Sequence, residues 1–326
     1  MHDGDCLALP RPPGSTLLNM RKLKNIYRYF LRKLFEAGQH VGFDILPRHF
    51  YSETPDVRVL KRGDSWKAPY SMAGVAGTAV EPQLALVSSC LTPEIRAHLS
   101  STNVHEAACQ ANGADGYGRV EADVLFAFVA SQKPAEIFQI GCGVSTSLCV
   151  EAARFAGYSP KITCVEPYPT PLLTRLAAEG KITLMQCQAQ DMNLATIDAL
   201  SGDVLFFVDS SHTLGPAGEV SRIILEMLPR LKPGAAVHFH DILFPYDYSR
   251  DVLNGALFFW HESVLLHAFL AYNSRFSVLA SCSMLHYGAK QEFQNLLSNY
   301  SPASDDHGLA TDNGHFPSSI YLRVGK

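Results

Sequence analysis

Short apolar runs alternate with helical segments between residues 135 and 240, and this alternation constrains the fold more than any other feature of the chain. The runs typical of strands cover 135–140, 161–166, 182–187, 204–209 and 235–240, and helices begin near Ser145, Thr170, Leu194 and Gly218. Strands separated by helices form a parallel sheet that is covered on both faces. We therefore predict an α/β fold: a Rossmann-like, doubly wound, mostly parallel seven-stranded sheet with an N-terminal helical cap.

The segments outside this region complete the predicted architecture. A helix over about 257–272 precedes closing strands at 276–280 and 319–324, and the polar stretch 301–315 is expected to be a loop. Helical spacing also occurs at 17–37 and 120–131, whereas 41–115 is rich in turn residues and indicates short helices. We divide the chain into a disordered tail (1–15), an N-terminal helix and cap segment (16–115) and a cofactor-binding Rossmann-like domain (116–326).

Charge and cysteine usage narrow the class of protein. The chain of 326 residues has 27 Lys and Arg against 31 Asp and Glu, a net charge of −4, which gives no indication of nucleic-acid binding. We find no apolar run of the roughly 18 residues that a transmembrane segment needs, and no secretory signal. The 8 cysteines form no CxxC pair and no zinc-type spacing, which favours a reducing, cytoplasmic location.

The helix at 17–37 carries apolar residues at helical spacing and basic residues over much of the remainder. Packing on the main domain or on a second subunit is one interpretation, and it leaves a homo-oligomer open. The alternative interpretation is a helix that lies on a membrane surface.

A glycine turn, Gly141-Cys142-Gly143-Val144-Ser145, follows the first strand of the predicted sheet. The two glycines let the backbone turn sharply, and the helix after them presents free N–H groups to an anion. Thr146 stands where a nicotinamide-dinucleotide loop has Gly or Ala, and no Lys-Ser/Thr follows as in a P-loop. An S-adenosylmethionine (SAM) site, with the methionine carboxylate as the anion, fits better. A turn without a ligand is the structural alternative.

Residues that suit the rest of SAM follow the next strands. Glu166 ends the second strand, where an acid can accept hydrogen bonds from both ribose hydroxyls. Asp191 follows the third strand and can accept from the adenine amino group, or instead cap the next helix. The predicted cofactor-binding residues are Gln139, Gly141, Cys142, Gly143, Ser145, Glu166, Gln190, Asp191 and Asp209.

Polar clusters follow the fourth and fifth strands, as Asp209-Ser210-Ser211-His212 and His238-Phe239-His240-Asp241. The carboxyl ends of parallel strands share one edge of a sheet, so both clusters are expected beside the glycine turn. Methyl transfer to oxygen or nitrogen needs an acceptor that is held in line and relieved of its proton. The predicted catalytic residues are His212, Asp241, Asp209 and His240.

Each of these residues has a defined role and an alternative. His212 is expected to act as a base near neutral pH. Asp209 and Asp241 orient that base or, as a speculative role, hold a divalent cation such as Mg²⁺. As structural alternatives, Asp209 caps the next helix, and His238 or His240 is a hydrogen-bonded interior histidine.

The motifs resemble class I SAM-dependent methyltransferases of the bacterial "methyltransferase domain 24" type. The resemblance covers roughly residues 45–285 and is strongest between 137 and 270. Its blocks are the glycine turn, Asp209-Ser210-Ser211-His212, Leu228-Pro229-Arg230-Leu231-Lys232-Pro233-Gly234, His238-Phe239-His240-Asp241-Ile242-Leu243-Phe244-Pro245, and Trp260-His261-Glu262 followed by Leu265-Leu266-His267-Ala268-Phe269-Leu270. The chain departs from the family pattern at Gln139, where an acid is usual, at His261, where Asn is usual, and more mildly at Glu121.

The resemblance implies a function as well as a fold. It implies SAM as the methyl donor and often O-methylation of a hydroxyl, sometimes with a divalent metal, in glycan or natural-product biosynthesis. We therefore predict a methyltransferase that acts on a small-molecule acceptor such as a sugar or natural product. The alternatives are an N-methyltransferase on a small molecule, a SAM-binding but inactive scaffold or regulatory subunit, and a nicotinamide oxidoreductase.

Overall fold

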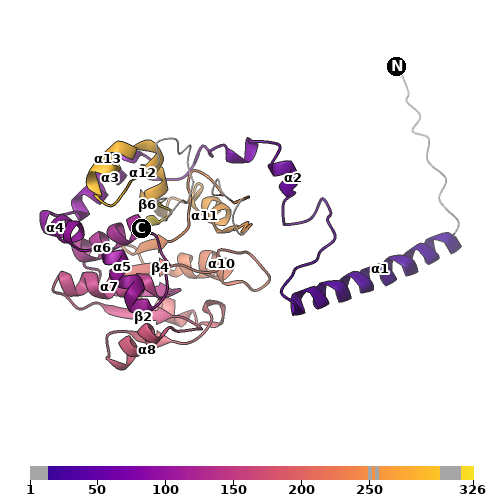
Figure 1. The fold of residues 1–326 in the computed structure, drawn as a ribbon, viewed down its shortest axis with the longest axis horizontal. Coiled ribbons are helices and arrows are strands. Elements are labelled where there is room, and N and C mark those ends of the chain that lie inside the picture. Colours follow the sequence, from indigo (N-terminus) through magenta and orange to yellow (C-terminus); the bar gives the residue numbers. More distant parts are fainter. Residues whose placement is uncertain (1–13, 249–251, 254–256, 302–316) are drawn as a thin grey trace, which may run out of the picture. The chain divides into compact units, whose positions relative to one another are not determined.

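The computed structural model describes residues 14–248, 252–253, 257–301 and 317–326 (Figure 1). The chain divides into two compact units, Met1–Asp56 and Val57–Lys326. The first unit contains the long helix α1 (Gly14–His40) and a following segment without regular structure. Of the predicted tail, residues 1–13 lie outside the described residues, as do residues 302–315 of the predicted loop.

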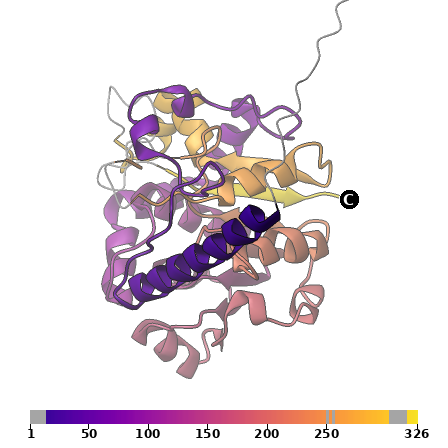
Figure 2. The same cartoon turned by 90° about the vertical axis from the view of Figure 1, so that its right-hand side faces the viewer.

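Seven strands form a single sheet in the unit Val57–Lys326, in the order β3-β2-β1-β4-β5-β7-β6. The strands are β1 (Glu136–Ile140), β2 (Lys161–Val165), β3 (Thr183–Met185), β4 (Val204–Val208), β5 (Ala236–Phe239), β6 (Phe276–Ser281) and β7 (Ile320–Val324). The first five pair in parallel, and β7 runs antiparallel between β5 and β6. In Figure 2, β7 is the yellow strand that leads to the C-terminus. The predicted mostly parallel seven-stranded sheet is confirmed.

Helices cover both faces of the sheet, with α5, α6 and α7 on one side and α10 and α11 on the other (Figure 1). The helices of this unit are α2 (Val57–Leu60), α3 (Val80–Cys90), α4 (Pro93–Ser101), α5 (Val104–Asn112), α6 (Arg119–Gln132), α7 (Val144–Phe155), α8 (Pro171–Ala178), α9 (Ala195–Asp198), α10 (Glu219–Arg222), α11 (Glu262–Leu270), α12 (Cys282–Gly288) and α13 (Lys290–Leu296). The starts of α7, α8, α9 and α10 lie within one residue of the predicted positions. The short helices predicted over 41–115 are α2 to α5.

The central strands are apolar because both of their faces are buried. Every residue of β4 is buried, and successive side chains alternate between two separate cores. Leu205 and Phe207 pack toward one set of helices, whereas Phe206 stacks on Phe138 of β1 with ring centroids 5.6 Å apart in the other core. Strands β2 and β3 lie on one side of β1, whereas β4 and β5 lie on its other side. This change of side places a topological switch point at the carboxyl ends of β1 and β4.

One predicted element begins later than expected. The helix predicted over 257–272 is α11, which spans only Glu262–Leu270. Leu257 has a positive φ of 60°, and the backbone N–H groups of His261 and Glu262 both donate to the carbonyl of His212, at 3.0 and 3.2 Å. This anchoring holds the chain before residue 262 out of a helix and ties the start of α11 to the end of β4.

Two further findings concern the whole described part of the chain. None of its helices is long and apolar enough to cross a membrane. The cysteines within it are all free thiols, and the cytoplasmic location predicted from them stays a prediction.

Candidate active site

The glycine turn between β1 and α7 fits tightly against the end of β4. Gly141 has a φ of +79°, and a Cβ atom there would lie 1.7 Å from the carbonyl oxygen of Asp209. The amide of Asp209 in turn donates to the carbonyl of Ile140 at 2.9 Å. Glycine is therefore required at 141 by both backbone conformation and space, and the turn lies directly beside the first residue after β4.

The second glycine of the turn lies under the side chain of Asn112, from the end of α5. A Cβ atom at Gly143 would lie 3.4 Å from Asn112 Nδ2. Asn112 Oδ1 accepts a hydrogen bond of 3.0 Å from Thr170 Oγ1, the N-cap residue of α8. The amide side chain thus links the turn to the segment that follows β2. Sequence reasoning gave Asn112 no role.

Gln139 is fully buried below the turn, where the family usually has an acid. Its Nε2 donates to Ser145 Oγ at 3.4 Å, and its Oε1 is 3.9 Å from the thiol of Cys164. Both ends of the amide thus contact neighbouring side chains in the core. The replacement of an acid by an amide leaves no uncompensated buried charge here.

Glu166 reaches the turn from the end of β2. Its carboxylate accepts hydrogen bonds from the backbone N–H of Cys142 at 3.2 Å and of Tyr168 at 2.9 Å. The acid predicted to bind ribose therefore borders the turn. Its bond to Cys142 also fixes the backbone between the two glycines.

Gln190 and Asp191 lie in a short 3₁₀ turn, Ala189–Asp191, after β3. Gln190 Nε2 donates to Gln188 Oε1 at 2.5 Å, and Asp191 is exposed. Helix α9 begins at Ala195 with Leu194 as its N-cap residue and without a capping side chain, and the nearby Asn193 Oδ1 accepts from the N–H of Ala195 at 3.0 Å. The alternative role of Asp191 as a helix cap is therefore wrong.

His212 lies at the centre of an acidic cluster after β4 and β5. Its Nδ1 is 2.7 Å from Glu262 Oε2, and its Nε2 is 3.5 Å from Asp209 Oδ1 and 3.7 Å from Asp241 Oδ2. The ring of Trp260 packs against it at 4.7 Å. His212 and Asp241 have positive φ angles of 59° and 56°, a strained conformation that is concentrated at functional sites.

The protonation of His212 differs from the sequence-based expectation. Burial disfavours the charged ring, but Asp209, Glu262 and Asp241 outweigh it and raise the pKa of His212 to about 10. The imidazole is therefore a cation at neutral pH. The acids around His212 favour the proton on its ring, and its predicted role as a base near neutral pH stays a prediction.

A second buried pair continues this arrangement. His240 Nδ1 forms an ion pair with Glu121 Oε1 at 3.2 Å, and His240 Nε2 is 3.5 Å from Asp241 Oδ1. Burial opposes ionisation of the ring, but Asp241 and Glu121 raise the pKa of His240 well above its ordinary value. Ser318 Oγ lies 2.8 Å from both Glu121 Oε1 and Asp241 Oδ1, and its single O–H can donate to either carboxylate. We call Glu121, Asp209, His212, His240, Asp241 and Glu262 the strand-end cluster.

His238 plays a different part from its neighbour His240. It is fully buried, and its Nε2 is 3.1 Å from the hydroxyl of Tyr117. The ring stacks on Phe207 with centroids 4.5 Å apart. Burial and the charge of His240 lower the pKa of His238 well below its ordinary value, so this residue is a neutral interior histidine, as one alternative predicted.

Comparison with known families gives one match in this part of the chain. Residues 138–242 match a family model described as a methyltransferase domain. The matched segment contains the glycine turn, Glu166 and the ends of β4 and β5, on a Rossmann-like sheet.

Individual relatives are distant from this chain. An uncharacterized protein of Archaeoglobus fulgidus is 24% identical over 212 residues, 61% of this chain and 91% of that protein. The SAH-bound methyltransferase PaMTH1 of Podospora anserina is similar with a TM-score of 0.38 and 19% identity, over 87% of this chain and 99% of that one. The O-methyltransferase TomG of Streptomyces achromogenes, in complex with SAM, is similar with a TM-score of 0.43 and 16% identity, over 71% and 95%.

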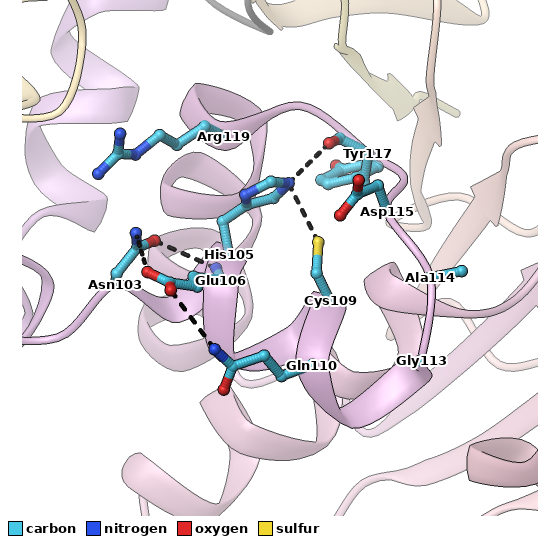
Figure 3. A pocket seen from close by; sticks show the side chains of 10 residues that line it. All are labelled: Asn103, His105, Glu106, Cys109, Gln110, Gly113, Ala114, Asp115, Tyr117 and Arg119. Carbon is cyan, nitrogen blue, oxygen red and sulfur yellow. Dashed lines mark hydrogen bonds between the residues drawn. The ribbon is translucent and has the colours of Figure 1, made fainter.

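A loop between α5 and α6 connects a surface pocket to the strand-end cluster. The pocket, of about 710 Å³, lies between α5 and the start of α6 (Figure 3). His105 Nε2 lies 2.9 Å from the carbonyl oxygen of Tyr117 and 3.5 Å from Cys109 Sγ (Figure 3). The ring of Tyr117 packs against His240 with centroids 4.6 Å apart. His105 thus anchors the loop that covers the histidines of β5.

The metal role of Asp209 and Asp241 stays a prediction. The carboxylate oxygens that face each other, Asp209 Oδ1 and Asp241 Oδ2, both lie against the cationic Nε2 of His212. In the described part of the chain, His, Cys, Asp and Glu side chains form no group of three or more that could hold a metal ion.

Two acids of the cluster were not predicted as site residues. Glu262 was noted within the Trp260-His261-Glu262 block, and Glu121 was noted in the helix before β1. Both side chains are almost completely buried, at 1% and 2% exposure. Burial of an acid costs free energy unless the acid is paired, and an acid within a predicted apolar helix is the signal that the sequence offers for both.

The raised pKa of His212 predicts a pH dependence of stability. Because the folded pKa of about 10 exceeds the ordinary value of 6.5, the protonated ring stabilises the fold fully below pH 6.5, and this contribution is lost as pH rises toward 10. The free energy of unfolding should therefore fall across that window, by at most roughly 1.4 kcal/mol per pH unit for this one proton. Urea denaturation of the wild type and of His212→Gln at pH 7 and 9.5 measures it. An equal fall in both proteins would contradict the assignment.

Proposed function

We propose that this methyltransferase transfers the methyl group of SAM to a hydroxyl group of a small molecule, such as a sugar or natural product. The observation that carries the proposal is the position of His212 between Asp209 and Asp241, beside the glycine turn. A hydroxyl group is too weakly acidic to ionise alone, so its methylation needs a proton acceptor at the site. A cluster of four carboxylates supplies one.

The residues around the turn suit the parts of SAM. The backbone of 141–143, Ser145 and the N-terminal end of α7 would hold the methionine carboxylate. Glu166 would accept from the ribose hydroxyls, and Gln190 and Asp191 would face the adenine. Gln139, buried beneath the turn, would support this end of the site through its hydrogen bond to Ser145. The close contact of Gly141 with Asp209, which a Cβ would abolish, is what brings the cofactor end of the site against the acids.

Asp241 is the proton acceptor in this proposal. His212 is already protonated, so the hydroxyl proton passes to a carboxylate. Asp241 Oδ1 is fixed by Ser318, and its Oδ2 faces His212. When bound, SAM supplies an electrophilic methyl group on a sulfonium. Asp241 would take up the proton that the acceptor oxygen loses as this oxygen gains the methyl group, with S-adenosylhomocysteine as the second product.

His212 and Glu262 act as positioning residues. The 2.7 Å bond between His212 Nδ1 and Glu262 Oε2 holds the ring so that Nε2 points between the two aspartates. Burial raises the pKa of Glu262 despite this bond. The protonated ring of His212 favours the ionised form of Asp209. His240 and His212 together lower the pKa of Asp209 against the effect of burial.

A screen for product tests the proposal. The full-length protein is incubated with SAM and a panel of hydroxylated sugars and phenolic natural products, matched by amines of similar size. We expect S-adenosylhomocysteine together with an acceptor that has gained the mass of one methyl group on oxygen. Methylation of amines alone would establish the N-methyltransferase alternative. SAM binding without turnover of any acceptor would favour the inactive scaffold or regulatory subunit.

A further inference from the structure

The helix α1 presents an apolar stripe to solvent. Leu23, Ile26, Tyr27, Phe30 and Leu34 recur at helical spacing, so they lie on one face. Their exposed fractions are 66%, 66%, 58%, 66% and 40%. Exposed large apolar side chains are ordinary when scattered, but a contiguous row of five marks a surface that has a partner.

Basic side chains border this stripe on both sides. With about 100° of rotation per residue, Lys24 falls along one border and Lys22 and Lys33 along the other, and Arg28 lies further round on the side of Lys24. The whole helix has six Lys and Arg and a single Glu, Glu36, in a chain with a net charge of −4. The positive charge is therefore concentrated around the apolar stripe rather than spread over the protein.

The segment after α1 continues the apolar surface within the same unit. Val41, Phe43, Leu46, Phe50 and Tyr51 are exposed by 70%, 68%, 65%, 81% and 78%. The rings of Phe50 and Tyr51 lie 3.8 Å apart. The same unit thus offers aromatic and aliphatic side chains beyond the helix itself.

We propose that α1, together with residues 41–51, docks onto an anionic lipid surface, with the helix in the plane of the interface. An apolar stripe bordered by cations fits an interface in which acyl chains lie below acidic headgroups. Pairing of two copies along this stripe would bring the basic borders of both helices together. The surface therefore favours a lipid bilayer over a second copy of the chain.

Vesicle flotation of the full-length protein tests the proposal. The vesicles are phosphatidylcholine alone and an equal mixture of phosphatidylcholine and phosphatidylserine. We expect flotation with the mixed vesicles, weakened by salt, and little with the neutral ones. Lys24→Gln with Arg28→Gln should lower partitioning about 25-fold, since each basic residue contributes roughly fivefold. Ile26→Gln with Phe30→Gln should lower it by about a hundredfold.

Matched substitutions in the other unit provide the control. Leu225, 57% exposed, and Lys232, also exposed, are changed to Gln together and should leave flotation unchanged. Circular dichroism checks that the α1 variants keep their helix content. Methyl transfer is measured in parallel, so that loss of lipid binding is distinguished from loss of activity.

Two results would overturn the proposal. The first is no flotation with the mixed vesicles, with a dimer in light scattering that Ile26→Gln and Phe30→Gln dissociate, which would make the stripe a subunit interface. The second is flotation that removal of Lys24 and Arg28 leaves unchanged, which would remove the role of anionic headgroups.

Discussion

The Gly141→Ala variant is expected to bind SAM about a hundredfold more weakly than the wild type or not at all, since a misplacement of about 1 Å in a site costs this much. A Cβ atom at this position would lie 1.7 Å from the carbonyl oxygen of Asp209. Relief of the clash needs a shift of more than 1 Å between the turn and the end of β4. That shift would move the glycine turn away from Glu166 and also away from the carboxylates of the strand-end cluster. Isothermal titration calorimetry with SAM measures the change.

Gly157 provides the matched control for Gly141. It also has a positive φ, 66°, but a Cβ atom there would meet no atom within 4 Å. Gly157→Ala therefore has the backbone cost alone, about 1 to 2 kcal/mol, and should keep its SAM affinity. Equal affinities in the two variants would show that the contact between Gly141 and Asp209 does not shape the cofactor site.

The Asp241→Asn variant is expected to lower kcat by a factor of about 10² to 10⁴, the usual contribution of a general base. The amide keeps the size of the side chain but cannot accept the proton of the hydroxyl. SAM affinity should change little, because Asp241 belongs to the acceptor side of the proposed site. Steady-state kinetics with the acceptor from the product screen, together with SAM titration, separates these effects.

Asp198→Asn is the matched control for this substitution. Asp198 pairs with Arg230 at the surface, 3.1 Å away, with its side chain 52% exposed. A surface pair of this kind has little effect on stability, and kcat should not change. An Asp241→Asn enzyme with wild-type kcat would remove Asp241 as the base and leave Asp209 as the remaining carboxylate beside His212.

The sheet could be predicted because its strands are encoded locally. Residues 204–208 are apolar without interruption because both faces of β4 are buried, and the same holds for most of β1. The start of α11 could not be predicted in this way. It depends on the carbonyl of His212, which binds the N–H groups of His261 and Glu262 from a distant part of the chain. The spacing of apolar residues along the sequence carries no information about such a long-range contact.

The cofactor turn and the strand-end acids were accessible from the sequence, because the carboxyl ends of parallel strands meet at one edge. The charge of His212, in contrast, could not be predicted from the sequence. It depends on Glu262, Asp209 and Asp241, which reach one ring from three separate segments and outweigh its burial. Glu121 reaches His240 in the same way from α6. The sequence shows such residues, but only the fold shows which of them meet.

Calorimetric titration of the full-length wild-type protein with S-adenosylhomocysteine tests the central claim most directly, with NAD⁺ as the competing cofactor. The site at Gly141, Glu166 and Asp209 predicts saturable binding of S-adenosylhomocysteine at one site per chain and no binding of NAD⁺. Saturable binding of NAD⁺, or no heat with either S-adenosylhomocysteine or SAM, would contradict the account.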